Sequence, residues 1–88
     1  MATRRAIERL LEKVASQSGT LTFAEFETIL NALGFVLNRQ AGSHRIYVHP
    51  RADRPFPVQP DGRDAKRYQV RELRDMIRRY GLSVDGSE

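Results

Sequence analysis

The chain has 88 residues, contains no cysteine and carries a formal net charge of +4. This length corresponds to one small domain, and the lack of cysteine excludes disulfide bonds and thiolate metal sites. No apolar run approaches the roughly 20 residues of a membrane span, and no apolar segment typical of a secretory signal follows the first residues. We therefore expect a cytoplasmic protein without membrane association.

The positive charge is concentrated in one part of the chain. Residues 1–30 hold four basic and four acidic side chains, whereas residues 31–82 hold eleven basic and five acidic ones. Ten of these eleven cations are arginine, which forms paired hydrogen bonds with phosphate. A polyanionic partner, RNA or DNA, is one explanation. The alternative is a solvated face on a small basic protein.

Two helices are predicted in the first third of the chain. Residues 4–16 place apolar side chains at helical spacing, which predicts an amphipathic helix ending near Gly19. A packing helix is the simpler interpretation, and an oligomer or partner surface is the alternative. Thr22 and Glu25 then form a capping-box pattern that begins a second helix. Gly34 is expected just past the end of that helix.

Three strands and a last helix are predicted in the remainder. Runs of β-forming residues at 35–39 and 43–49 flank a hairpin loop over 40–42, where Gly42 supplies a positive φ. Residues 56–58 predict a third strand, whose prolines suit an edge position. Asp61-Gly62 marks a turn and residues 63–66 a polar connection. Residues 69–80 predict a helix that ends at Gly81.

This order of elements predicts an α+β fold. Without the first helix it reads αβββα, the order of double-stranded-RNA-binding domains, with a three-stranded antiparallel sheet that has two helices on one face. The other sheet face is expected to be open. We divide the chain into an N-terminal helical extension (1–20), this domain (21–82) and a flexible tail (83–88).

The catalytic chemistry available to the chain is limited. It has no HExxH, Walker-A or GxSxG motif, and Asp61 and Asp64 lack the further ligands of a calcium loop. We expect neither a metal nor another cofactor. RNA, however, carries its own nucleophile, the 2′-hydroxyl. A single histidine can take that proton or protonate the leaving 5′-oxygen, while arginines stabilise the phosphate.

His44 is the better placed of the two histidines. It shares strand parity with Ile46 and Val48, which predicts that it points toward the helix-covered face at the rim of the sheet. The alternative is a histidine that caps the sheet edge through a backbone hydrogen bond. His49, which precedes Pro50, is expected to be structural or on the surface.

Three segments of the chain form a recognisable set: LNALGF at 30–35, RQAGSHRIYVHP at 39–50 and PVQPDGRDAKRYQVRELRDMIRRYGL at 57–82. With Leu33-Gly34-Phe35, Arg39, Gly42-Ser43-His44 and Tyr47 at its centre, this set resembles the HicA (YcfA-like) toxins of bacterial type II toxin–antitoxin systems. The resemblance covers about residues 22–82.

The resemblance implies an mRNA interferase, a metal-independent endoribonuclease with His44 as its catalytic residue. It also implies a HicB-type antitoxin that masks the active site, and oligomers are expected only within that complex. The chain departs from the family pattern at Gln59, where many relatives have a second histidine. It also departs at Arg67-Tyr68-Gln69-Val70, which replaces a glycine–threonine start of the last helix.

RNA-binding residues are expected in two groups. Around the hairpin, Gly42 and Ser43 present His44, Arg39 is a phosphate ligand, and Arg45 and Tyr47 are expected on the open sheet face, where they bind phosphate or stack on a base. Packing at the hairpin is the alternative for Tyr47. The second group is a basic ridge on the last helix, for which a solvated face is the alternative: Lys66, Arg67, Arg71, Arg74 and Arg78.

Two rival functions fit the same residues. One is a module that binds RNA without cutting it. The other is a regulatory protein that has kept the fold and lost the activity, and the glutamine at position 59 is its only support.

Overall fold

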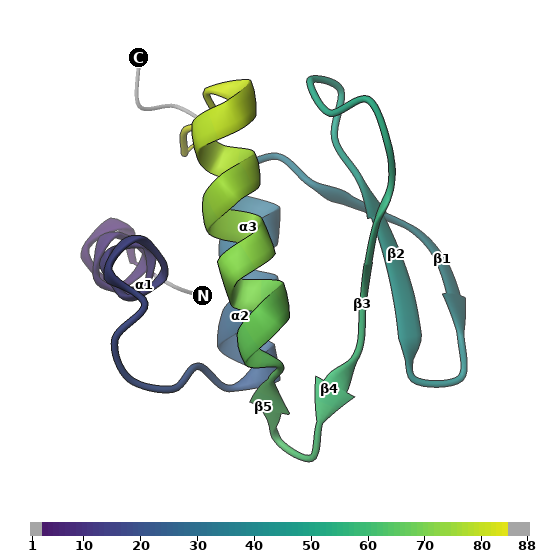
Figure 1. Ribbon diagram of the computed structural model, residues 1–88, viewed down its shortest axis with the longest axis horizontal. Helices are drawn as coiled ribbons and strands as arrows, with labels where there is room; N and C mark the ends of the chain where they lie inside the picture. Colours follow the sequence, from purple (N-terminus) through teal and green to yellow (C-terminus); the bar gives the residue numbers. More distant parts are fainter. Residues whose placement is uncertain (1–2, 85–88) are drawn as a thin grey trace.

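A three-stranded antiparallel sheet forms one side of the molecule, and two helices cover one of its faces (Figure 1). The computed structural model describes residues 3–84, and the last four residues of the predicted flexible tail lie outside this range. The sheet consists of β1 (Val36–Ala41), β2 (His44–Val48) and β3 (Phe56–Val58), in that order. Helices α2 (Phe23–Ala32) and α3 (Arg67–Tyr80) pack on it. The predicted α+β fold of αβββα order is therefore confirmed.

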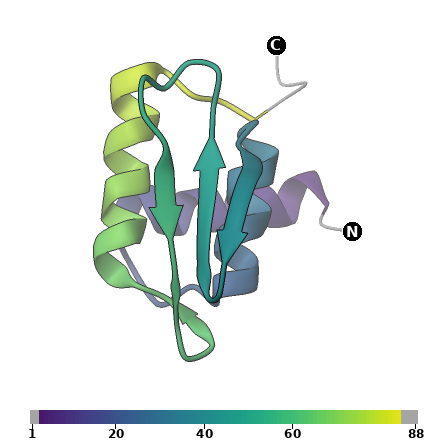
Figure 2. The same cartoon turned by 90° about the vertical axis from the view of Figure 1, so that its right-hand side faces the viewer.

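Helix α1 (Arg4–Ser16) forms a third layer. It packs against α2 and α3 on the side away from the sheet, and Figure 2 shows it behind both helices when the sheet faces the viewer. Val14 is the fully buried residue of α1. The helix is thus part of the packed structure. It lies on the helix layer and not at an edge of the sheet.

The core lies between the sheet and the helices. Its largest fully buried side chains are Phe26, Ile29 and Leu30 of α2, Leu73 of α3 and Val58 of β3, together with Val14. Phe26 meets Phe56 edge to face, with ring centroids 6.2 Å apart. Burial of these side chains is the main favourable term that holds the two helices on the sheet.

The start of α2 has the capping box that the sequence predicts. The Glu25 amide donates to the Thr22 hydroxyl at 3.1 Å, and the Thr22 amide donates to the Glu25 carboxylate at 3.0 Å. These reciprocal bonds satisfy two amides that would otherwise lack partners at the helix start. At the other end, Gly34 has a φ of +100°, as expected for a residue just past a helix.

The β1–β2 hairpin differs slightly from its predicted form. Ala41 pairs with His44, so the loop contains Gly42 and Ser43, and Gly42 has a φ of +61°. The predicted positive φ is confirmed, whereas the loop begins two residues later than expected. A register shift between Leu37 and Arg39 interrupts the ladder near its other end.

A small hairpin between β3 and α3 is absent from the sequence prediction. Strands β4 (Pro60–Asp61) and β5 (Asp64–Ala65) flank the turn at Gly62. The Phe23 amide donates to the Arg63 carbonyl and the Ala65 amide to the Leu21 carbonyl, which ties this hairpin to the start of α2. Two-residue strands have no alternation to detect, so only these tertiary bonds reveal them. None of the helices within residues 3–84 is long and apolar enough to cross a membrane.

Candidate active site

His44 lies on the open face of the sheet, at the end of the β1–β2 hairpin. Directly paired residues of neighbouring strands point to the same face, and His44 pairs with Ala41 while Arg39 pairs with Ile46. The alternate residues of β2, Arg45 and Tyr47, point to the other face, where they contact Glu27 of α2. His44, Arg39 and Ile46 therefore share the face that is turned toward the viewer in Figure 2. The His44 side chain is exposed.

This arrangement corrects the prediction for β2. The sequence predicts His44 toward the helices and Arg45 and Tyr47 on the open face, and the orientation is the reverse. Tyr47 is only 3% exposed, and Arg45 is partly buried beneath the sheet. The prediction assigns the inward positions to the apolar Ile46 and Val48, but Arg45 and Tyr47 find a polar partner inside. The base-stacking and phosphate roles expected for Arg45 and Tyr47 on the open face do not fit this geometry.

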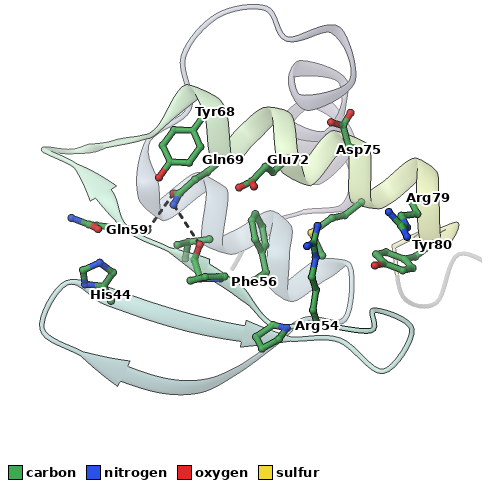
Figure 3. A pocket seen from close by; sticks show the side chains of 14 residues that line it. His44, Arg54, Phe56, Gln59, Tyr68, Gln69, Glu72, Asp75, Arg79 and Tyr80 are labelled. Atoms are coloured by element: carbon green, nitrogen blue, oxygen red, sulfur yellow. Dashed lines mark hydrogen bonds between the residues drawn. The ribbon is translucent and has the colours of Figure 1, made fainter.

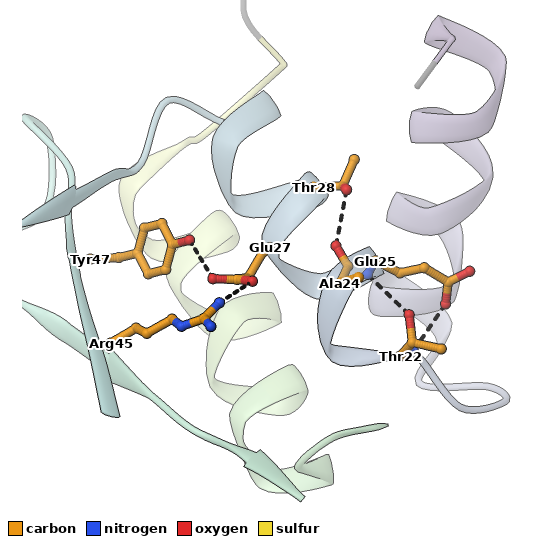
Figure 4. Close-up of polar contacts among 7 residues, drawn as sticks. All are labelled: Thr22, Ala24, Glu25, Glu27, Thr28, Arg45 and Tyr47. Carbon is orange, nitrogen blue, oxygen red and sulfur yellow. Dashed lines mark hydrogen bonds and ion pairs between the residues drawn. The ribbon is translucent and has the colours of Figure 1, made fainter. Parts of the chain in front are cut away.

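That polar partner is Glu27 of α2 (Figure 4). One of its carboxylate oxygens accepts from Arg45 Nη1 at 2.5 Å and the other from the Tyr47 hydroxyl at 2.7 Å. The Arg45 guanidinium also lies 5.2 Å from the centroid of the Phe23 ring. These contacts fix the inner face of β2 on α2, and so hold the strand from which His44 projects on the other side.

The electrostatics of this cluster follow from its burial. Burial, reinforced by the hydrogen bond to Glu27, raises the pKa of Tyr47 well above its ordinary value. The hydrogen bond with Glu27 raises the pKa of the Arg45 guanidinium. Arg45 therefore stays charged and Tyr47 neutral at physiological pH. The cluster is a structural connection between α2 and β2.

His49 has a structural position, as the sequence predicts. Its Nε2 bonds the Leu33 carbonyl at the end of α2 at 2.8 Å, and its Nδ1 accepts from the Arg51 amide at 3.0 Å. Because the amide can only donate, Nδ1 carries no proton and Nε2 is the donor. The ring also packs edge to face on Phe35, with centroids 4.9 Å apart. Both ring nitrogens of His49 are thus occupied by the fold.

An open cleft of about 640 Å³ runs between β3 and α3, and His44 lies at one end of it (Figure 3). Gln59 lies next to His44 there, since it follows Val58, the partner of Arg45. The α3 wall carries Tyr68, which is 49% exposed, the acidic side chains of Glu72 and Asp75, and Arg79. Arg54 also lines the cleft. Gln59, at which the sequence departs from the pattern it resembles, is therefore a neighbour of His44.

Gln69 closes the free edge of β3. Its side chain is buried, its Oε1 accepts from the Gln59 amide at 3.2 Å and its Nε2 donates to the Pro57 carbonyl at 3.4 Å (Figure 3). The amide side chain thereby takes the place of a further strand. It connects α3 to the strand that carries Gln59.

The predicted basic ridge lies on a different part of the surface. Arg67, Arg71 and Arg74 line a groove between α3 and the end of α1, and Arg78 lines a neighbouring apolar groove. None of these arginines lines the cleft that contains His44. Lys66 is the N-cap residue of α3 and makes no side-chain cap. The structure thus brings Arg39 onto the face of His44 and separates the ridge from it.

Three residues near the site are not predicted as site residues from the sequence: Glu27, Tyr68 and Gln69. In the sequence Glu27 cannot be told from an ordinary surface acid, because its partners Arg45 and Tyr47 are 18 and 20 residues away. Gln69 is a buried polar residue at the start of an apolar helix face, and burial is not visible in composition. Within residues 3–84, no three His, Asp or Glu side chains are grouped so that they could hold a metal ion.

The comparison with known families agrees with this architecture. A family model described as the HicA toxin of bacterial toxin–antitoxin systems matches residues 23–82. The matched segment begins with α2 and ends just after α3, so it contains the sheet with its two covering helices and leaves out α1. No curated protein and no solved structure matches the chain. Since the match covers well over half of its residues, the chain belongs to the HicA family of toxins, whose partners are antitoxins.

Proposed function

We propose that this toxin is a metal-independent endoribonuclease that cleaves mRNA, with His44 as its general acid or base. The observation that carries the proposal is the contrast between the two histidines. His49 has both ring nitrogens bound within the fold, whereas His44 is exposed on the open sheet face with Arg39. Of the two histidines, only His44 is free to exchange a proton with a bound substrate.

The reaction uses the nucleophile of the RNA itself. The 2′-oxygen attacks the adjacent phosphorus, its proton passes to a base, and the bond from phosphorus to the 5′-oxygen breaks as that oxygen gains a proton. A histidine acting in either proton transfer contributes about 10²–10⁴-fold to the rate. Arg39 lies on the same face as His44 and can bind the phosphate oxygens, whose charge increases during the reaction.

The cleft beside His44 supports a role for α3 in holding the substrate. Tyr68 exposes its ring along this cleft, and an exposed aromatic ring can stack on a nucleobase without selecting its identity. Gln59, next to His44, has an amide that can form hydrogen bonds but cannot exchange a proton. His44 is then the single histidine of the proposed reaction centre.

We further propose that a HicB-type antitoxin neutralises the toxin by covering the open sheet face. Apart from His44 and Arg39, this face carries Val36, Ile46, Val48 and Pro57, and Val36 is 59% exposed. An apolar surface bordered by polar side chains is typical of the centre of a protein interface. A protein bound there would bury His44 together with these side chains.

Cleavage of a defined mRNA by the purified toxin in the presence of a metal chelator tests the proposal. His44→Ala is expected to cut at least ~100-fold more slowly than the wild type. Gln40→Ala is the matched control. Gln40 is exposed on the same hairpin, but it pairs with Arg45 and therefore belongs to the other face of the sheet. It is expected to cut within ~2-fold of the wild type.

The two other outcomes are informative. Equal rates for the wild type and His44→Ala, with both proteins folded by circular dichroism, would exclude His44 as the catalyst. RNA that is bound but not cut by the wild type would replace the nuclease with the RNA-binding function.

A further inference from the structure

A cationic groove separates the end of α1 from the first turns of α3. Its walls are Lys13 and residues 17–20 on one side and Arg67, Arg71 and Arg74 on the other, and its volume is about 300 Å³. The buried side chains of Leu21, Ala65 and Val70 also line it. No acidic side chain is among the described residues that line it. Figure 1 shows the chain leaving α1 and passing the start of α3. We call this feature the α1–α3 groove.

The arginines of the α1–α3 groove form a row along α3. Their spacing of four and three residues places them on one stripe of the helix. Arg74 pairs with Asp75 at 3.2 Å, and no other ion pair within residues 3–84 involves the groove cations. The pair joins a partly buried Arg74 side chain, 25% accessible, to an exposed Asp75 side chain, 63% accessible. Within residues 3–84, Arg67 and Arg71 have no acidic partner, so at least two of the three positive charges of the row are not paired.

This charge is not explained by the stability of α3. Like charges at these spacings repel each other, and a helix is stabilised by acidic rather than basic residues in its first turn. Helix α3 has no acidic residue in its first turn and begins Lys66-Arg67. Basic residues at the N-terminus of α3 destabilise the helix. Such an arrangement is expected where the N-terminus binds an anion.

Part of the α1–α3 groove lies outside the segment that matches the family. The matched residues begin at Phe23, so Lys13 and residues 17–20 lie outside the segment shared with the family. Lys13 is held at the groove by its bond to the Thr20 carbonyl, 3.3 Å long, and its ammonium keeps further donors for a ligand. Helix α1 thus adds a second wall to a basic helix face.

We infer that the α1–α3 groove binds the phosphate backbone of RNA at a distance from the point of cleavage. The inference rests on the proposed function, and it assigns the groove to substrate holding. A row of arginines opposite a lysine matches the repeated charge of a nucleic-acid strand. An interface with a folded protein would have an apolar centre, but the exposed large hydrophobic residues Val36, Leu37 and Tyr68 all lie elsewhere.

The groove and His44 act on different parts of the substrate. The cleft of His44 is lined by Tyr68, Glu72 and Asp75, which lie on another flank of α3 from Arg67 and Arg71. Groove contacts are consequently made equally in the bound substrate and in the transition state. Their loss is expected to raise KM while kcat stays unchanged.

Binding of the full chain to a fluorescent single-stranded RNA with 2′-O-methyl groups, which cannot be cut by this chemistry, tests the inference. The variant Arg67→Gln/Arg71→Gln is expected to bind at least ~10-fold more weakly at about 50 mM salt. The dependence of log K on log salt should become shallower by ~1.4, at ~0.7 per lost phosphate contact on a single strand.

The control is Arg5→Gln/Arg9→Gln, which removes the same charge from exposed positions of α1 that line none of the grooves described. It should bind within about two-fold of the wild type. Equal losses in the two double variants would overturn the inference, because they would show an effect of net charge alone. Weaker binding of the antitoxin with unchanged binding of RNA would also overturn it and would make the groove a protein interface.

His44→Ala keeps this test separate from the proposed function. Loss of cleavage in His44→Ala together with unchanged RNA binding in the groove variant would reject the groove and keep the nuclease. Weakened RNA binding in the groove variant together with unchanged cleavage in His44→Ala would support the groove and reject His44.

Discussion

Gly34 and His49 meet where α2 ends. A Cβ atom on Gly34 would lie 3.1 Å from His49 Nε2, the atom that bonds the Leu33 carbonyl. The φ of +100° at Gly34 is also in a region that other residues adopt only with strain. Two independent constraints, one conformational and one steric, therefore require glycine at this position.

Gly34→Ala is accordingly expected to destabilise the protein more than Gly42→Ala. Gly42 also has a positive φ, but a Cβ atom added there would meet nothing within 4 Å. Backbone strain costs about 1–2 kcal/mol at either site, and Gly34→Ala loses about 1 kcal/mol more with the hydrogen bond of His49. Urea unfolding of both variants measures the difference. Equal losses would mean that the contact with His49 contributes nothing.

At the scale of elements, the orientation of β2 is the main departure from the sequence prediction. The alternation in HRIYV predicts the aliphatic residues inward, because aliphatic side chains have no polar group to satisfy. Arg45 and Tyr47 instead bury their long apolar stems and satisfy their polar ends on Glu27. The period of two is correctly predicted, but the choice between the two faces depends on a carboxylate far away in the sequence.

The side chain of Gln69 is expected to hold the β3 edge in place. In Gln69→Ala, the Gln59 amide and the Pro57 carbonyl lose their partner. Because Gln59 is only partly buried and Pro57 is exposed, the loss is expected to be that of ordinary hydrogen bonds, about 1 kcal/mol, and hydrogen exchange at the Gln59 amide should become faster. Chemical denaturation and amide exchange measure the two effects.

Glu72→Ala is the control for this variant, since Glu72 is exposed on the same helix. It should change the free energy of unfolding by less than about 0.5 kcal/mol. The role assigned to Gln69 would be wrong if its variant were no less stable than this control.

For the whole molecule, α1 lies far from His44, so its contribution to stability can be measured separately from the proposed catalysis. Val14 is 1% exposed and packs α1 onto the helix layer, on the side away from the sheet. Val14→Ala should lower the free energy of unfolding by about 1.5–3 kcal/mol, because two buried methyl groups are lost and a cavity remains. Thermal unfolding of Val14→Ala and of the exposed control Glu12→Ala measures this loss.

Val14→Ala should leave the rate of RNA cleavage per folded molecule unchanged, since His44 lies on the far side of the sheet from α1. Cleavage assays well below the unfolding temperature of Val14→Ala check this. A folded Val14→Ala protein with a reduced cleavage rate would show that α1 is coupled to the site.

The sequence by itself determined the elements that depend on neighbouring residues. The capping box at Thr22, the positive φ of Gly34 and Gly42 and the edge position of Phe56–Val58 all follow from local geometry. The resemblance of residues 22–82 to HicA toxins also depended only on the spacing of residues along the chain, and the family match over 23–82 confirms it.

Tertiary structure alone decided which faces meet. It placed His44 and Arg39 on the open sheet face, turned Arg45 and Tyr47 toward Glu27, and set Arg67, Arg71 and Arg74 against the end of α1. Periodicity shows that two faces of an element differ, but not which partner each face will contact. That choice depends on pairings between residues far apart in sequence, whose energies exist only once the chain has folded.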